Sequence, residues 1–238
     1  MKALILNSGT GSRLGSLTKK NPKCMTQISK DETILSRQLH QLSRFGITDV
    51  VITTGKFHNE IKEHCLALNL PLKFEFVQNL EYADTNYIYS MHLAADKLND
   101  ELISMHGDLV FEDHVLSAVI DSKAENCMTI SSTLPLPEKD FKAVITDNRI
   151  IKVGVNFFDN SVAAQPLYKV SKSTMQIWLT EISQYCTEGN TSVYAENALN
   201  DITKYFVLSP VDVRNTLCAE IDTIEDLEFV KKQLEETN

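Results

Sequence analysis

The chain has 238 residues, of which 43% are hydrophobic and 23% are charged, with 8 glycines and 6 prolines. This composition excludes a disordered or fibrous chain and is typical of a globular protein with a full hydrophobic core. The 32 acidic residues outnumber the 23 basic ones, which gives a net charge of −9. Such a balance argues against a general nucleic-acid binder or a binder of anionic membranes. We therefore expect a small-molecule partner, with no nucleic acid and no membrane.

The cysteines and the start of the chain bear on the cellular compartment. An odd number of widely spaced cysteines without a Cys-x-x-Cys pair favours reduced thiols over a disulfide framework or a zinc site. The first two residues lead directly into an apolar strand pattern, so no signal peptide is expected. No apolar stretch reaches the roughly 18 residues of a membrane-spanning helix. We expect a cytoplasmic protein whose five thiols are Cys24, Cys65, Cys127, Cys186 and Cys218.

The first half of the chain alternates short apolar runs with amphipathic helical patterns. Strand-like runs occupy residues 3–6, 50–54, 73–77, 102–105 and 128–131. Helical patterns occupy about 34–45, 58–68, 86–98 and 113–122. This alternation predicts a mostly parallel sheet with helices on both faces and with ligands beyond the carboxyl ends of its strands.

After about residue 133 the pattern becomes antiparallel. Runs at 143–146 and 150–153 flank Asp147-Asn148, a typical hairpin turn. Further strands are expected near 155–158 and 163–169, then an amphipathic helix at 172–185. Thr223 and Asp226 have the spacing of a capping box before a last helix. Since no linker is evident, we expect a single domain over 1–238, in which about 133–200 forms an antiparallel, substrate-facing subregion.

The basic residues are unevenly distributed along the chain. Residues 1–30 hold six basic and no acidic residues, whereas the rest of the chain holds all 32 acidic residues against 17 basic ones. Within this segment Gly9, Gly11 and Gly15 follow the first strand, and their backbone N–H groups could form an anion-binding nest. Arg13 and Lys23 would add full charges. The spacing excludes both the Walker phosphate loop and the dinucleotide fingerprint.

Carboxylates follow two other predicted strand regions. Asp108 lies just past the apolar run at 102–105, where the crevice of a parallel sheet is expected. Glu220 and Asp222 occupy alternate positions, which point the same way in an extended strand. Taken singly, Asp108 could be a turn residue and Asp222 a helix cap. Together they are candidate ligands for a hard divalent cation.

The segment Gly9-x-Gly11-x-Arg13 followed by Pro22-Lys23 resembles the signature loop of the nucleotidyltransferases. These enzymes join a nucleoside triphosphate to a phosphorylated substrate and release pyrophosphate. The resemblance implies a Rossmann-like, three-layer α/β/α fold with a mixed, mostly parallel sheet. The chain departs from the family pattern at Gly15-Ser16, where proline is frequent, and at Asn7-Ser8, where two alanines are usual. The second departure leaves the contacts with the nucleotide base open.

The same resemblance assigns roles to the residues around the loop. Arg13 would grip the leaving pyrophosphate, and Lys23 would stabilise the charge that develops at the α-phosphate. A magnesium ion would be held by Asp108 and Asp222, with Glu220 nearby. The nucleotide-binding residues implied are Leu6, Asn7, Ser8, Gly9, Thr10, Gly11, Ser12 and Gly107.

A third segment narrows the class of enzyme. Residues 82–90, which read Tyr-Ala-Asp-Thr-Asn-Tyr-Ile-Tyr-Ser, are similar to a stretch of the small phosphocholine cytidylyltransferases, and residues 154–159 and 194–197 resemble two later stretches. The resemblance implies CTP and a small phosphate or phosphonate that carries an amino group. The acceptor-binding residues implied are Asn86, Tyr87, Phe158, Asp159, Tyr168 and Glu196.

The chemistry of the acceptor's head group stays open at this point. A quaternary ammonium would need an aromatic cage, for which Tyr87, Phe158, Tyr168 and Trp178 are available, although core packing explains Trp178 equally well. A primary amine, as in 2-aminoethylphosphonate, would need carboxylates. Asp159 and Glu196 could supply these or be solvated surface acids.

The predicted reaction is an in-line attack by an acceptor oxygen on the α-phosphorus of CTP, with no general base because that oxygen is already anionic. Two alternatives remain. A sugar-1-phosphate nucleotidyltransferase, using UTP or dTTP, would share the loop and the metal acids. A regulatory nucleotide-binding module would keep the fold without turnover. His106 receives no role, and the oligomeric state, a homodimer included, stays open.

Overall fold

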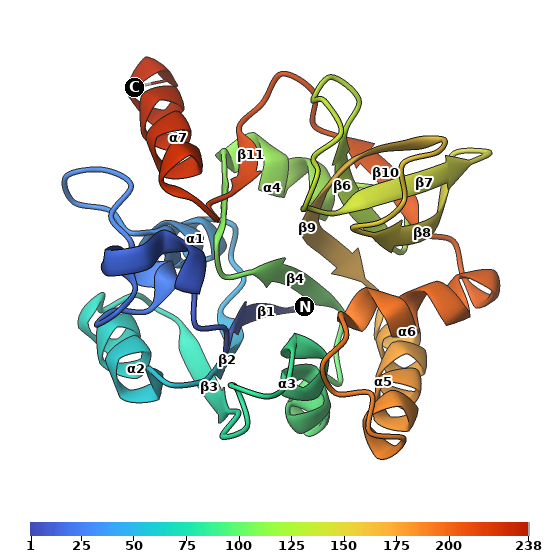
Figure 1. Cartoon of the computed structure of the whole chain (residues 1–238), viewed down its shortest axis with the longest axis horizontal. Coiled ribbons are helices and arrows are strands. Elements are labelled where there is room, and N and C mark those ends of the chain that lie inside the picture. Colours follow the sequence, from blue (N-terminus) through green and yellow to red (C-terminus); the bar gives the residue numbers. More distant parts are fainter. Residues whose placement is uncertain (238) are drawn as a thin grey trace.

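A nine-stranded mixed sheet forms the centre of the computed structural model, which describes residues 1–237 apart from the side chains of Ser12 and Thr237 (Figure 1). The strand order is β10-β6-β9-β4-β1-β2-β3, and β7 extends the sheet from β9 and pairs with β8. Strands β3, β2, β1 and β4 are parallel to one another, whereas β9 is antiparallel to β4 and β6. The strands are β1 (Lys2–Asn7), β2 (Asp49–Thr54), β3 (Lys73–Gln78), β4 (Leu102–His106), β6 (Cys127–Ser131), β7 (Lys142–Thr146), β8 (Arg149–Gly154), β9 (Ser161–Val170) and β10 (Ser209–Asp212).

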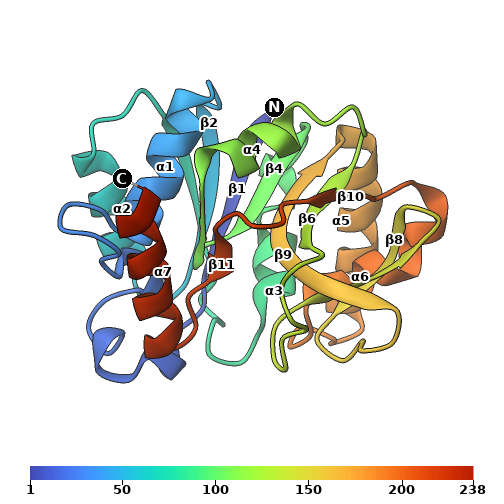
Figure 2. The same cartoon turned by 90° about the horizontal axis from the view of Figure 1, so that it is seen from above.

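Helices cover both faces of this sheet (Figure 2). Successive side chains of a strand point to opposite faces, so Leu4 of β1 joins one hydrophobic core while Ala3 and Ile5 join the other. The first core includes α3, α5 and α6, and the second includes α1, α2 and α4. The predicted three-layer α/β/α fold is thereby confirmed. The helices are α1 (Ile34–Arg44), α2 (His58–Ala67), α3 (Tyr87–Leu93), α4 (Asp113–Ile120), α5 (Lys172–Thr187) and α6 (Ala195–Ile202).

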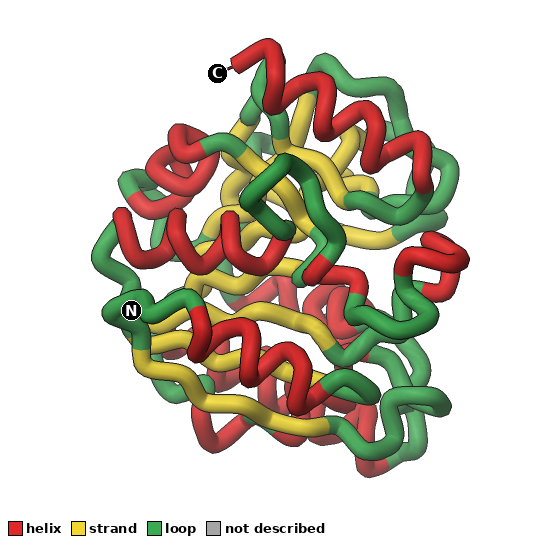
Figure 3. The backbone as a smooth tube through the Cα atoms, turned by 90° about the vertical axis from the view of Figure 1, so that its left-hand side faces the viewer, coloured by secondary structure: helices red, strands yellow, loops and turns green. Residues whose placement is uncertain are grey.

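The C-terminal helix α7 (Ile224–Thr237) packs outside these layers, along the top of Figure 3. It follows a small antiparallel sheet of β5 (Leu109–Phe111) and β11 (Cys218–Glu220). Thr223 and Asp226 exchange backbone-to-side-chain hydrogen bonds, which is the predicted capping box. Val230 is fully buried in a third core with Leu14, so the last helix supports the glycine-rich segment near the N-terminus.

The structure departs from the expected elements at three places. The strand expected at 155–158 is wrong, because β8 ends at Gly154 and the Ser161 hydroxyl closes a turn by donating to the carbonyl of Phe157. Helix α6 was not predicted, and the helix expected at 86–98 divides into α3 and a short 3-10 turn at Ala95–Lys97. No helix within 1–237 combines the length and the apolar character needed to cross a bilayer.

Candidate active site

A cleft of about 320 Å³ opens at the carboxyl ends of β1 and β4. Its walls come from the glycine-rich segment, the start of α3, the end of β4, residues 139–141 and the β11 region. Ligands bind at this edge in open α/β sheets. The predicted site residues that line the cleft are Leu6, Asn7, Ser8, Gly9, Gly11, Arg13, Lys23, Asn86, Tyr87, Gly107, Asp108, Glu220 and Asp222.

The glycine-rich segment is held in one conformation by local contacts. Gly11 has a φ of +63°, and a Cβ there would lie 2.8 Å from the Cβ of Lys23, so a side chain at this position would be strained and would displace Lys23. The Thr18 hydroxyl donates to the carbonyl of Gly11 at 2.8 Å. Leu14 is 1% exposed and anchors the segment in the third core. The loop therefore places Lys23 at a defined point of the cleft.

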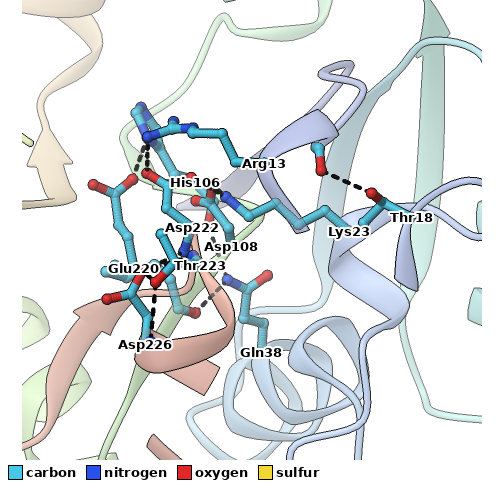
Figure 4. Close-up of polar contacts among 12 residues, drawn as sticks. Arg13, Thr18, Lys23, Gln38, His106, Asp108, Glu220, Asp222, Thr223 and Asp226 are labelled. Atoms are coloured by element: carbon cyan, nitrogen blue, oxygen red, sulfur yellow. Dashed lines mark hydrogen bonds and ion pairs between the residues drawn. The ribbon is translucent and has the colours of Figure 1, made fainter. Parts of the chain in front are cut away.

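The basic loop and the acidic residues meet in the cleft (Figure 4). The Lys23 ammonium donates to Asp108 Oδ2 at 2.5 Å and also to Asp222 Oδ1. The Arg13 guanidinium lies 2.8 Å from Asp222 Oδ2. The backbone N–H groups of Asp222 and Thr223, just before α7, donate to Asp226 Oδ2 and fix the position of Asp222. Segments far apart in the sequence thus form one charged network.

The network has a definite charge state at neutral pH. Burial by itself would lower the pKa of Lys23, but the charges of Asp108 and Asp222 outweigh it and raise that pKa. Burial would likewise raise the pKa of Asp108, yet the charge of Lys23 outweighs it and keeps the pKa below its ordinary value. At neutral pH the structure therefore holds an ammonium between carboxylates, in a place where phosphates could replace them as partners.

His106, which has no predicted role, forms a second charged pair in the cleft. Its Nδ1 lies 2.9 Å from Glu220 Oε1. Burial lowers the pKa of His106, but the hydrogen bond to Glu220 and its charge prevail and raise it to about 9. Burial, with the charge of Asp108, raises the pKa of Glu220. Perturbed, interacting groups of this kind are typical of functional sites.

The part of the cleft at the tip of β1 contains Asn7 and Ser8. The Asn7 amide nitrogen is buried and has no hydrogen-bond partner among the described residues. A Cβ at Gly107 would lie 1.6 Å from Asn7 Oδ1, so only glycine leaves room for this side chain. The Ser90 hydroxyl donates to the Ser8 hydroxyl at 2.7 Å. Thr10 is exposed and is not among the lining residues, and the Ser12 side chain lies outside the described part.

Four aromatic rings form one wall of the cleft, which we call the ring wall: Tyr87, His106, Phe141 and Tyr194. Each ring contacts the next, with centroid distances of 4.8 Å for Tyr87 and His106, 5.8 Å for His106 and Phe141, 5.2 Å for Phe141 and Tyr194, and 5.9 Å for Tyr194 and Tyr87. A second cavity of about 350 Å³ adjoins this wall and shares Phe141 and Tyr194 with the cleft. The wall therefore separates two spaces.

Several predicted acceptor residues do not reach the cleft. Phe158 is 53% exposed, and the Lys142 ammonium covers its ring at 4.2 Å. Asp159 is exposed, and neither residue is among those that line the two cavities. Trp178 is 1% exposed and donates to the carbonyl of Ala195, so it belongs to the core. Of the proposed cage, the structure brings Tyr87 alone to the cleft.

Tyr168 and Glu196 lie behind the ring wall. Both are 2% exposed, and the Tyr168 hydroxyl donates to Glu196 Oε1 at 2.8 Å. The hydroxyl of Tyr87 donates to the other carboxylate oxygen. Glu196 lines the second cavity, whereas Tyr168 is not among the described lining residues of either cavity. Of the two alternatives left open for Glu196, the structure contradicts a solvated surface acid.

Residues 2–149 match the family model described as Nucleotidyl transferase. The chain belongs to this family. It is 23% identical over its whole length to the choline-phosphate cytidylyltransferase of Streptococcus pneumoniae, which it also covers completely. It is 29% identical over 57% of its length to the CMP-5'-(3-aminopropyl)phosphonate synthase of Streptomyces rubellomurinus, of which the match covers 21%. The inositol-1-phosphate CTP transferase of T. maritima superposes with a TM-score of 0.79 at 20% identity, over 99% of this chain and 96% of that one.

The donor set of this nucleotidyl transferase fits a hard divalent cation. Asp108 Oδ1 is buried and has no hydrogen-bond partner among the described residues. One ligand atom each from His106, Asp108 and Glu220 lie within 4.8 Å of one another. Carboxylate oxygens are preferred by Mg²⁺, and both oxygens of Asp222 already accept from basic side chains. Asp108 is thus the best-placed of the three predicted metal ligands.

Other residues of the cleft were missed by the sequence reasoning. Tyr82 and Thr85 lie within the stretch that resembles the cytidylyltransferases, and that stretch could have identified them. Lys139, Asp140 and Phe141 lie in an irregular segment before β7, where no periodic pattern marks a position as facing a ligand. The ring wall is similar: its four members come from four separate segments, and only the fold brings them together.

Proposed function

We propose that this nucleotidyl transferase is a Mg²⁺-dependent cytidylyltransferase that transfers CMP from CTP to a small phosphorylated or phosphonylated amino-alcohol. The observation that carries the proposal is the Lys23 ammonium, shared by Asp108 and Asp222 at the centre of the cleft. A cation and two carboxylates in this arrangement suit a triphosphate and its metal ion. Two relatives, a choline-phosphate cytidylyltransferase and a CMP-5'-(3-aminopropyl)phosphonate synthase, support the choice of CTP and of the acceptor class.

In the proposed reaction an oxygen of the acceptor's phosphate or phosphonate attacks the α-phosphorus of CTP. A new P–O bond forms there, the bond from the α-phosphorus to the β-phosphate oxygen breaks, and pyrophosphate leaves. The attacking oxygen is anionic, so no proton has to be removed from it. Catalysis then consists of positioning and of neutralising charge.

The residues of the cleft divide this work. Lys23 is assigned to the α-phosphate, where it lowers the repulsion between the two anionic reactants. Arg13, whose side chain is 57% exposed, is assigned to the leaving pyrophosphate, because it can move from Asp222 to a phosphate without being dislodged from the core. Asn7 and Gly107 border the nucleotide. A bound Mg²⁺, with Asp108 as the principal ligand and Glu220 and Asp222 beside it, would supply further positive charge.

The acceptor is assigned to the side of the ring wall. Aromatic faces attract ammonium groups, and Tyr87, Phe141 and Tyr194 present rings there. The carboxylate of Glu196 adds negative charge behind them. Together these groups support an acceptor with a positively charged nitrogen over a hexose phosphate, whose sugar carries no positive charge.

The test is a matrix of purified chain with CTP, UTP or dTTP and with phosphocholine, 2-aminoethylphosphonate or glucose 1-phosphate, read out as pyrophosphate release. We expect turnover with CTP and an amino-alcohol phosphate or phosphonate, and loss of turnover when EDTA removes the divalent cation. Preference for UTP or dTTP with glucose 1-phosphate would replace the proposal by a sugar-nucleotide synthase. CTP binding without pyrophosphate release for any pair would indicate a non-catalytic nucleotide-binding module.

A further inference from the structure

The carboxylate of Glu196 is unusual in its surroundings. The residue is 2% exposed, and each oxygen of its carboxylate accepts a hydrogen bond from a tyrosine hydroxyl. Tyr87 donates to one oxygen and Tyr168 to the other. A buried carboxylate is costly unless hydrogen bonds compensate it. This buried carboxylate lies directly behind the ring wall of the cleft, and its position there indicates a functional role.

The two tyrosines that hold Glu196 have different positions. Tyr87 is the first residue of α3, directly after the N-cap Asn86, and its ring forms part of the ring wall. Tyr168 lies in β9 within the core and is not among the described lining residues of either cavity. Burial, followed by the charge of Glu196, raises the pKa of both phenols well above its ordinary value, so both remain donors. Glu196 therefore ties a cleft residue to a core residue.

The ring of Tyr87 contacts two of the other three members of the ring wall, His106 at 4.8 Å and Tyr194 at 5.9 Å. A phenol ring without a bond at its hydroxyl can change its side-chain rotamer, and its neighbours would then repack. The hydrogen bond from its hydroxyl to Glu196 holds the Tyr87 ring in one rotamer. Glu196 is the second residue of α6, whose N-cap is Tyr194, so the start of this helix is connected to the wall at two points.

We propose that Glu196 is a positioning residue for the acceptor: it fixes the Tyr87 ring in the wall of the cleft through a hydrogen-bond chain that runs to Tyr168. The inference rests on the proposed function, because it assigns the ring wall to the acceptor. It differs from a direct contact of Glu196 with an ammonium group, since both oxygens already serve the tyrosines. Acceptor affinity should then depend on Tyr168, which lies behind Glu196 and not in the cleft.

The experiment measures KM for acceptor and for CTP, together with kcat, in Tyr168→Phe, Glu196→Gln and Glu196→Ala. Tyr168→Phe keeps the ring and the packing but removes one donor, and we expect the acceptor KM to rise about threefold to tenfold, which is the size of a typical net hydrogen-bond contribution. The acceptor KM should rise further in Glu196→Ala. It should stay closer to the wild-type value in Glu196→Gln, because the amide can still bond both tyrosines. The KM for CTP and kcat at saturating acceptor should stay within about twofold.

The matched control is Tyr185→Phe. Tyr185 of α5 donates to Asp201 at 2.6 Å, which is also a tyrosine bonded to a carboxylate of α6, but its surroundings are exposed and it is not among the lining residues. It should leave both KM values unchanged. An unchanged acceptor KM in a folded Tyr168→Phe, or an equal rise for acceptor and CTP, overturns the inference. Wild-type turnover is measured first. Its absence with every acceptor contradicts the proposed function and not this inference. If the wild type turns over another acceptor, the KM values are compared with that substrate.

Discussion

Replacing Lys23 by methionine tests the charged network most directly, because it removes one ammonium and keeps most of the side-chain volume. In the wild type the ammonium is shared by Asp108 and Asp222, and the three side chains are 13%, 22% and 13% exposed. The substitution leaves both carboxylates without their shortest cationic contact. Arg13 still pairs with Asp222, so Asp108 loses the most.

The expected loss of stability follows from these contacts. Removing one partner of a fully buried ion pair costs about 3–5 kcal/mol, and a single hydrogen bond to a charged group contributes roughly 1.5–3 kcal/mol. Because the site is partly open to solvent and Asp222 keeps Arg13, we expect the free energy of unfolding to fall by about 2–3 kcal/mol at pH 7. Turnover should fall at least about a hundredfold, as when one preorganised donor to a transition state is lost.

The pH dependence of this loss has a definite sign. Lys23 keeps the folded-state pKa of Asp108 below the value of about 3.9 for an unfolded aspartate. The ion pair therefore stabilises the wild type above that value, and the stabilisation disappears as the pH falls through the lower, folded-state pKa. In the variant Asp108 is protonated more readily. The difference between the two proteins should be largest near pH 7 and should shrink below about pH 4.

The assay is urea unfolding of Lys23→Met and wild type at several pH values, with EDTA and with Mg²⁺, beside pyrophosphate release. Added Mg²⁺ should stabilise the variant more than the wild type, because a bound cation replaces the missing charge. Lys19→Met is the matched control, since Lys19 is an exposed lysine of the same basic segment. Unfolding midpoints equal to the wild type at pH 7, or turnover within tenfold of it, would refute the role given to Lys23.

Three further substitutions and one labelling experiment probe other parts of the site. Gly107→Ala places a Cβ 1.6 Å from Asn7 Oδ1, so it should raise the KM for CTP and lower stability by about 1–3 kcal/mol, whereas Gly189→Ala, with open space around its Cβ, should leave the KM unchanged. Trp178→Phe should lower the free energy of unfolding by about 1–3 kcal/mol, because it removes buried ring volume and the hydrogen bond to the carbonyl of Ala195, and an unchanged urea midpoint would contradict the placement of Trp178 in the core. Cys186 should react first with a thiol reagent at pH 8, because the other four thiols are buried and burial raises the pKa of Cys65 to about 12.

Much of the fold is predictable because its signals are local. Strands β1, β2 and β4 lie in the centre of the sheet, and their continuous apolar runs mark them without knowledge of their neighbours. Helix α1 carries both a capping box at Thr33 and a stop signal at Gly46, whose φ is +73°. By contrast, α6 has eight residues and the apolar face of Ala195, Ala198, Leu199 and Ile202, which is too short a pattern to stand out before packing is known.

The site divides in the same way. The charged network consists of Arg13 and Lys23, from the loop that follows β1, and of carboxylates just after two other strands. The topology of a parallel sheet brings such positions together without any detail of packing, so a sequence motif can predict them. The ring wall, to which we assign the acceptor, depends on contacts between side chains. Phe158 and Trp178 have the right chemistry for a cage, yet one is turned outward beneath Lys142 and the other is packed in the core.

Because the charged network and the ring wall are held by different contacts, turnover and acceptor preference can vary separately. Lys23, Asp108 and Asp222 hold one another through charge, so a change at any of them alters the whole phosphate end. The ring wall is held instead by ring contacts, by the bond between Tyr87 and Glu196 and by the contact of His106 with Glu220. Substitutions at Phe141 can therefore change the shape of the acceptor space while the charged network stays intact. Selectivity among acceptors is thus expected to map to the ring wall, and turnover with any acceptor to the charged network.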